Sequence, residues 1–230
     1  MTERTFDCIL RKDPRSRAYP VRSAMACDAE PQSRLWDCAK NLDQGSEGAC
    51  VGFGCAHELI AEPVPALSVD NRYARERIYW PAQTIDPWPG GAYEGAESYY
   101  EGTSLLAGLR TVRRLGWCSE YRWSFTLDDL ILGIANCGPA IVATEWLDDM
   151  AHPDGTGMIY ATGKLQGHHC YIIRGADMDM GMFRIRNSWG EPWGIHGDAF
   201  ISFEDFWRLM EHEGEAAFLV GRTMPCESAA

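Results

Sequence analysis

The sequence has 230 residues, 46% of them hydrophobic and 23% charged, with a formal net charge of −12. Its aromatic content of 11% argues against an intrinsically disordered chain, and its length corresponds to one or two folded domains. The acidic balance argues against a protein that binds nucleic acid through the phosphates, so we expect no nucleic-acid partner.

No segment of the sequence has the features of a bilayer span or a secretory signal. The longest nearly apolar stretch, residues 130–144, is interrupted by Asn136, Gly138 and Pro139, whereas a helical span needs about 20 apolar residues. The first 17 residues contain no apolar core. We therefore expect a cytoplasmic or virion-associated protein without a membrane partner, whose nine cysteines are mostly reduced thiols.

The first half of the chain has helical patterns that follow an irregular N-terminal arm. Residues 1–35 scatter three prolines among charged side chains and predict the arm. Apolar spacing and capping Ser or Thr residues predict helices over residues 50–61, 104–115 and 127–136. The first two of these helices belong to a mainly helical lobe that we expect over residues 36–125.

Beyond Gly138 the pattern changes to short runs of β-branched and aromatic residues. These runs are PAIVATEW, CYIIRGA, MFRIRNSW and DAFISF, and they predict strands. A further short helix is predicted over residues 204–210. A helical front followed by a stranded back indicates an α+β chain in two lobes. Residues 126–230 are expected to form the mainly β lobe, and the two lobes one integrated domain.

Cys50 has the sequence environment of a reactive thiol. It follows the Gly-rich loop NLDQGSEGA and begins a predicted helix, where unpaired N–H groups and the helix dipole stabilise a thiolate. Farther along, His169 directly precedes the run CYIIRGA, and Asn187 ends a predicted strand. A thiol, an imidazole that takes its proton and an amide that orients the imidazole form a complete nucleophilic set.

Three segments around these residues resemble the papain family of cysteine peptidases. DQGSEGACVGF resembles the family's nucleophile loop, GHHCYIIRGAD its histidine strand and RNSWGEPWGIHGDAFIS its asparagine segment. His169 and Asn187 lie 119 and 137 residues after Cys50, a span slightly shorter than the usual ~130–150. The resemblance covers residues 36–205. It implies the papain-like two-lobe fold, in which a helical lobe and an antiparallel β-barrel lobe enclose an active-site cleft.

The resemblance also implies a role for each residue that matches a family motif. Cys50 matches the nucleophile and His169 the general base and acid. Asn187 matches the amide that orients the imidazole, and Trp189 the indole that shields the bond between them. Gln44 matches the side-chain donor of the oxyanion hole, whose other donor is the Cys50 backbone N–H. The activity implied is that of a thiol peptidase that forms an acyl-enzyme and needs no metal or organic cofactor.

The resemblance places further residues beside the substrate. Gly102 and Thr103 fall where the family's glycine pair lines the non-prime side of the cleft, and His168 lies next to the pocket for the substrate's second residue. The partner implied is a peptide or protein substrate. The sequence does not define which residues of a substrate are preferred, or the oligomeric state.

Two departures from the family pattern affect these expectations. Glu47 replaces a half-cystine three residues before the nucleophile, and we expect its carboxylate to face solvent, because an inward carboxylate would raise the pKa of Cys50. Only 49 residues precede Cys50, too few for a full inhibitory pro-segment of the family type. Either the enzyme is made active, or residues 1–35 serve another purpose.

Three alternatives remain open. An acyl-enzyme on the same fold can pass its acyl group to an amine, which would make the protein a transpeptidase or amidase. A papain-like fold can also serve as a non-catalytic binding or assembly module. A third alternative is a zinc site, although the spacings of its ligands are not those of a ribbon or finger. Its candidate ligands are Cys50, Cys55, His57, His168, His169 and Cys170.

Overall fold

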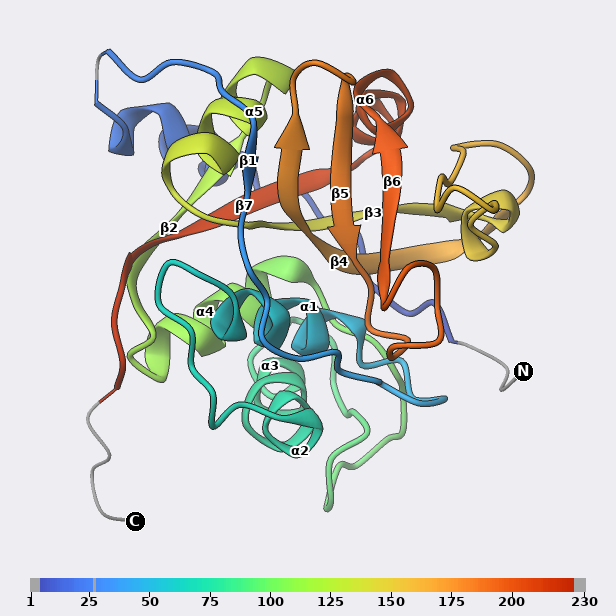
Figure 1. Ribbon diagram of the computed structural model, residues 1–230. Coiled ribbons are helices and arrows are strands. Elements are labelled where there is room, and N and C mark those ends of the chain that lie inside the picture. Colours follow the sequence, from blue (N-terminus) through green and yellow to red (C-terminus); the bar gives the residue numbers. More distant parts are fainter. Residues whose placement is uncertain (1–4, 27, 226–230) are drawn as a thin grey trace.

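The computed structural model describes residues 5–26 and 28–225, which form a helical layer packed against an antiparallel sheet (Figure 1). The elements in chain order are η1 (Pro14–Ala18), η2 (Val21–Ala24), β1 (Arg34–Leu35), α1 (Cys50–Ile60), α2 (Asn71–Tyr73), η3 (Ala74–Tyr79), α3 (Trp80–Gln83), α4 (Leu105–Arg114), β2 (Cys118–Ser124), α5 (Leu127–Asn136), β3 (Ala140–Leu147), η4 (Asp148–Ala151), β4 (Leu165–Asp177), β5 (Met182–Arg186), β6 (Asp198–Ser202), α6 (Phe203–Glu211) and β7 (Glu215–Arg222). None of the helices in these described ranges is long and apolar enough to cross a membrane.

The sheet is antiparallel and open. Its order is β2-β7-β3-β4-β5-β6, with β1 paired to β4. The predicted α+β fold with an antiparallel sheet is confirmed, but the sheet does not close into the expected barrel. Trp123 of edge strand β2 pairs with Pro20 of the arm, and Phe200 of edge strand β6 pairs with Met158. Each edge strand therefore has a backbone partner outside the sheet at one position.

The predicted helices are present, and the structure adds elements that the sequence analysis did not predict. Helix α5 has the predicted bounds, and α1, α4 and α6 differ from prediction by one residue at one or both ends. Thr126 and Ser104 accept the capping hydrogen bonds that begin α5 and α4. The additions are the short helices η1, η2 and η4, the helical turns over residues 71–83 and the strands β1, β2 and β7. Strand β2 pairs with β7, so residues 118–124 lie in the sheet although the sequence analysis assigned them to the helical lobe.

Helix α1 lies between the sheet and the helices α2 and α3 (Figure 1), and all of its residues are buried. Two glycines permit this position. A Cβ at Gly52 would lie 2.6 Å from the Ala74 carbonyl oxygen, and a Cβ at Gly54 would lie 2.8 Å from the Cys170 sulfur on β4. The helix is therefore closely packed on both sides, which fixes the position of Cys50 at its N-terminus.

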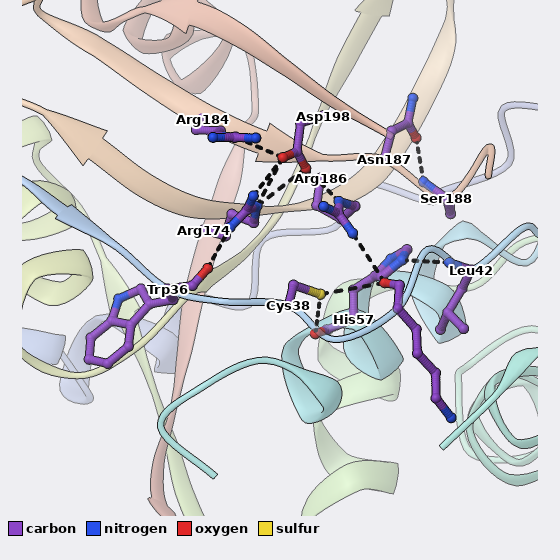
Figure 2. A network of polar contacts seen from close by, with 11 residues as sticks. Trp36, Cys38, Leu42, His57, Arg174, Arg184, Arg186, Asn187, Ser188 and Asp198 are labelled. Carbon is purple, nitrogen blue, oxygen red and sulfur yellow. Dashed lines mark hydrogen bonds and ion pairs between the residues drawn. The ribbon is translucent and has the colours of Figure 1, made fainter. Parts of the chain in front are cut away.

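A buried cluster of charges joins three strands of the sheet (Figure 2). Asp198 on β6 is fully buried and pairs with Arg174 of β4, Arg184 of β5 and Arg186 of β5. Burial alone would raise the pKa of Asp198, but the hydrogen bonds and charges of Arg186 and Arg174 lower it below its ordinary value. The carboxylate is therefore ionised at neutral pH.

The same cluster holds the chain that leads to the helical layer. Arg174 donates to the Trp36 carbonyl at 2.6 Å, and Arg186 donates to the Lys40 carbonyl at 3.1 Å. A little farther on, the Leu42 N–H donates to Nε2 of His57 on α1 at 3.0 Å (Figure 2). The segment of residues 36–42 is thus fastened to β4, β5 and α1 by polar contacts.

Replacing the carboxylate at the centre of this cluster should be strongly destabilising. We expect Asp198→Asn to lower the free energy of unfolding by about 3–5 kcal/mol at neutral pH, because it leaves buried guanidinium groups without a counter-charge. The contribution of Asp198 is present above its unfolded pKa of about 3.9 and is lost as the pH falls through the lower folded value. Urea unfolding measures the change.

Glu191→Gln provides the control, because Glu191 is 70% exposed and forms its ion pair with the exposed His196. We expect it to change the free energy of unfolding by less than about 0.5 kcal/mol. A loss of under about 1 kcal/mol in Asp198→Asn would show that the cluster does not stabilise the fold.

Candidate active site

Cys50 is the first residue of α1, and its thiol is fully buried. The preceding residue, Ala49, provides no side-chain cap, so the positive end of the helix dipole acts on the sulfur without a competing acceptor from that residue. The six residues before Cys50 form the loop that carries Gln44. This local arrangement follows from the Gly-rich sequence, which lets the chain turn tightly into the helix.

His169 and Asn187 come from neighbouring strands of the sheet and meet in the buried interior. His169 lies in β4, and Asn187 directly follows β5. Nε2 of His169 lies 2.8 Å from Oδ1 of Asn187. That oxygen also accepts the Ser188 N–H at 2.7 Å. Because Oδ1 can only accept, Nε2 carries a proton, and Nδ1 is the nitrogen left for the thiol.

The thiol of Cys50 is acidified by its surroundings. Burial alone would raise its pKa. The Cys8 thiol and the charge of the His169 imidazole outweigh burial and hold the pKa of Cys50 well below its ordinary value. The contact with His169 is loose, since Nδ1 forms no hydrogen bond of good geometry with a described residue. Loose contacts of this kind tighten when a substrate is bound.

Aromatic rings enclose the imidazole. The ring centre of His169 lies 5.3 Å from that of Trp189, 4.9 Å from Trp146 and 5.9 Å from Phe6. Such a shell excludes water and strengthens the hydrogen bond between His169 and Asn187. Trp189 was predicted from its motif, whereas Trp146 and Phe6 lie in no motif of the family and were not predicted.

Gln44 lies within hydrogen-bond distance of the loop that follows Asn187. Its side-chain oxygen accepts from the Ser188 hydroxyl at 2.6 Å, and its backbone N–H donates to the Ser188 carbonyl at 2.9 Å. Its amide nitrogen donates to the Glu47 carbonyl at 2.9 Å. The amide is thereby held in one orientation, with one of its two N–H groups engaged.

Glu47 does not face solvent, so that expectation is wrong. Its carboxylate is largely buried and forms an ion pair with Arg75, and it accepts a hydrogen bond from the indole N–H of Trp80 at 3.2 Å. Both partners come from the helical turns over residues 71–83, which the sequence analysis did not predict. The guanidinium neutralises the carboxylate, and this is why an inward acid is tolerated three residues from Cys50.

A segment of the N-terminal arm lies across the site. The Cys8 N–H donates to the His168 carbonyl at 3.1 Å, and the Ile9 N–H donates to the Thr103 carbonyl at 3.0 Å. We call residues 5–9 the cleft segment. Its two bridges, to His168 and to Thr103, are both parallel. The cleft segment therefore contacts the three residues that the family resemblance placed beside the substrate, Gly102 included.

The cleft segment covers the nucleophile closely. A Cβ at Gly102, where φ is +91°, would lie 1.8 Å from the Asp7 carbonyl oxygen, and a Cβ at Gly48 would lie 2.4 Å from the Asp7 carboxylate. Phe6 packs on His169, and Thr5 bonds to the Ser46 carbonyl. Sequence analysis missed this arrangement. The one local signal is the short apolar run of residues 8–10 within a charged arm.

The zinc alternative finds no support in the geometry. In the part of the chain that the structure describes, no group of three or more His, Cys, Asp or Glu side chains is arranged to hold a metal ion. Cys55 lies on α1 one turn beyond the nucleophile and is buried in the helical core. The Cys170 sulfur lies against Gly54. The described cysteines are free thiols.

Comparison with known proteins reveals similarity at the level of structure. No protein-family model matches the sequence, and no curated protein matches it. Xylellain, a cysteine protease from Xylella fastidiosa, aligns with a TM-score of 0.67 and 15% identity over 97% of this chain and 99% of its own.

Two eukaryotic proteins are also similar. The digestive procathepsin L 3 of Tenebrio molitor aligns with a TM-score of 0.58 and 14% identity, over 95% of this chain and 76% of its own. Bromelain from Ananas comosus, solved with the inhibitor E64, aligns with a TM-score of 0.54 and 14% identity, over 84% of this chain and all of its own. These similarities show that the chain has the fold of the papain-like cysteine proteases.

Proposed function

We propose that the protein is a cysteine-type peptidase that hydrolyses peptide bonds through a thiolate–imidazolium pair. One observation supports a peptide as its substrate. The groove beside Cys50 already holds an extended peptide, the cleft segment, whose backbone N–H groups donate to the His168 and Thr103 carbonyls. An acidified thiol at the floor of a groove that accepts extended backbone is the arrangement that peptide cleavage needs.

Each residue then has a chemical task. The Cys50 thiolate attacks the peptide carbonyl carbon, and the Gln44 amide and the Cys50 N–H donate to the developing oxyanion. The imidazolium of His169 protonates the leaving amine, which releases the first product and leaves an acyl-enzyme. His169 then takes a proton from water, which attacks and releases the acid. Asn187 and Trp189 hold the imidazole in place throughout.

The covered state of the structure is a resting state in this proposal. Cys50 and His169 are both fully buried, so no substrate reaches the sulfur while the cleft segment is in place. The cleft segment must leave, or be displaced by substrate, before cleavage begins. It runs parallel to the residues that it pairs with on both walls.

Turnover of short fluorogenic peptide amides by the reduced protein should depend on the thiol of Cys50. We expect Cys50→Ala to abolish turnover and Gln44→Ala to lower kcat by about 10²–10³. Because the thiolate is the reactive form and the pKa of Cys50 is lowered, kcat/KM should decline only as the pH falls well below the ordinary thiol pKa of about 8.5.

Cys55→Ala is the matched control, since Cys55 lies on the same helix but is not placed at the site. Burial, with the charge of Glu58 adding to it, raises the pKa of Cys55. The control should retain turnover. Equal turnover by the wild type and Cys50→Ala would contradict the proposal.

A second prediction concerns the cleft segment. Gly102→Ala should push the Asp7 carbonyl away, because the new Cβ would lie 1.8 Å from that oxygen. We expect alkylation of Cys50 by iodoacetamide at pH 5–6 to become at least about tenfold faster, which corresponds to about 1.4 kcal/mol of destabilisation of the covered state. Peptide mapping by mass spectrometry follows the label.

Gly95→Ala separates this effect from backbone strain. Gly95 has a similarly positive φ of +83°, but a Cβ there would meet no atom within 4 Å. The Gly95→Ala variant should therefore have the alkylation rate of the wild type at Cys50. If the two variants react at the same rate, the cleft segment does not protect the thiol.

A further inference from the structure

Two thiols meet at the floor of the groove. Cys8 is the only cysteine in the cleft segment, and it is 2% exposed, while Cys50 is fully buried. Both belong to the same packed cluster of side chains. The two thiols act on each other's acidity, since Cys8 lowers the pKa of Cys50 and Cys50 raises the pKa of Cys8. The backbone bonds of Cys8 to His168 and of Ile9 to Thr103 hold that thiol from both walls of the groove.

The other cysteines near the nucleophile are directed elsewhere. The sulfur of Cys170 packs against Gly54, a full helical turn beyond Cys50, and the sulfur of Cys55 packs toward Gly108 of α4. Both are held in rigid elements, a central strand and a buried helix. Cys8, by contrast, belongs to an arm that no strand or helix fixes at that point. Of these three cysteines, it is the one placed to approach the Cys50 sulfur.

We propose that Cys8 is the resolving cysteine of a reversible disulfide with Cys50, which locks the cleft segment over the nucleophile under oxidising conditions. The proposal rests on the proposed function for the role of Cys50 as the nucleophile. The disulfide itself requires only that the two sulfurs approach to bonding distance, about 2.05 Å. The backbone hydrogen bonds of the cleft segment hold the buried Cys8 at the site, so only a local movement of this segment is needed to bring the sulfurs together.

The chemistry balances with hydrogen peroxide as the oxidant. The Cys50 thiolate attacks one peroxide oxygen, the O–O bond breaks, and protonation of the leaving hydroxide gives a Cys50 sulfenic acid and water. The Cys8 sulfur then attacks the sulfenic sulfur. The S–S bond forms, the S–OH bond breaks, and the Cys8 proton leaves with the hydroxyl as a second water. Two thiols and one peroxide become one disulfide and two waters.

The two thiols have the properties that these steps need. The neighbouring Cys50 and burial raise the pKa of Cys8, so Cys8 stays protonated and does not react with peroxide first. The acidified Cys50 does react first. A dithiol reductant then reverses the disulfide by exchange and restores both thiols. The lock therefore protects the nucleophile from irreversible oxidation to the sulfinic acid.

Peptide mapping of the oxidised full-length protein tests the proposal. The reduced protein is treated with equimolar hydrogen peroxide at neutral pH, and the remaining thiols are blocked with N-ethylmaleimide. Under non-reducing conditions, we expect the Cys8 peptide to be joined to the Cys50 peptide, with a mass about 2 Da below the sum of the two. Dithiothreitol should separate the two peptides. A link from Cys50 to any other cysteine, or no link, would overturn the proposal.

A pair of variants supplies a second readout. After excess peroxide and then dithiothreitol, Cys8→Ser should hold Cys50 largely as sulfinic acid, about 32 Da heavier, while the wild type should recover at least about tenfold more free Cys50. Cys170→Ser, which removes another buried thiol near the nucleophile, should behave as the wild type does. Equal recovery in wild type and Cys8→Ser would overturn the resolving role.

These readouts are masses, so they do not depend on peptide hydrolysis. A Cys8–Cys50 disulfide in a protein whose reduced form cleaves no peptide would support the disulfide proposal and refute the proposed function. Peptide cleavage by a protein that forms no such disulfide would support the proposed function and refute the disulfide proposal.

Discussion

The site depends on how closely helix α1 lies against strand β4. Gly54 leaves no room for a side chain beside Cys170, and this contact brings the thiol of the helical layer next to the imidazole of the sheet. Burial at that interface works against a thiolate. Cys55, on the same helix, shows the result when nothing offsets burial, because its pKa is raised. At Cys50 the Cys8 thiol and the His169 imidazole outweigh the same penalty, and the pKa is lowered.

The rest of the molecule keeps the two layers in this relation. Asp198 and its arginines join β4, β5 and β6 and hold the segment of residues 36–42, which leads into the loop of Gln44 (Figure 2). Asn187 directly follows one of those arginines in the chain, so the same cluster positions the amide that holds His169. The aromatic shell keeps water from that hydrogen bond. The cleft segment completes the enclosure from the open side of the groove.

Much of this arrangement follows from local signals, and the remainder depends on distant contacts. Apolar spacing and Ser or Thr caps are local, so the helices at α1, α4, α5 and α6 were predictable. Whether the sheet closes was not predictable, because closure depends on whether the two edge strands meet. Here residues of loops pair with both edge strands instead. The ion pair of Glu47 with Arg75 and the course of residues 5–9 link parts far apart in sequence, which no periodicity encodes. Cys50, His169 and Asn187 were predicted from sequence motifs, but no sequence pattern indicated that residues 5–9 cover them.

The chemistry of the site requires Cys50 to be a thiolate, which the Cys8 thiol and the His169 imidazole stabilise against burial. Ultraviolet absorbance of the thiolate during a pH titration tests it most directly, since burial raises the pKa of the neighbouring thiols Cys55 and Cys170. The account predicts thiolate absorbance that persists well below pH 8, disappears in Cys50→Ala and shifts to higher pH in His169→Ala. A wild-type signal that appears only at or above the ordinary thiol pKa of about 8.5, or one that His169→Ala leaves unchanged, would contradict it.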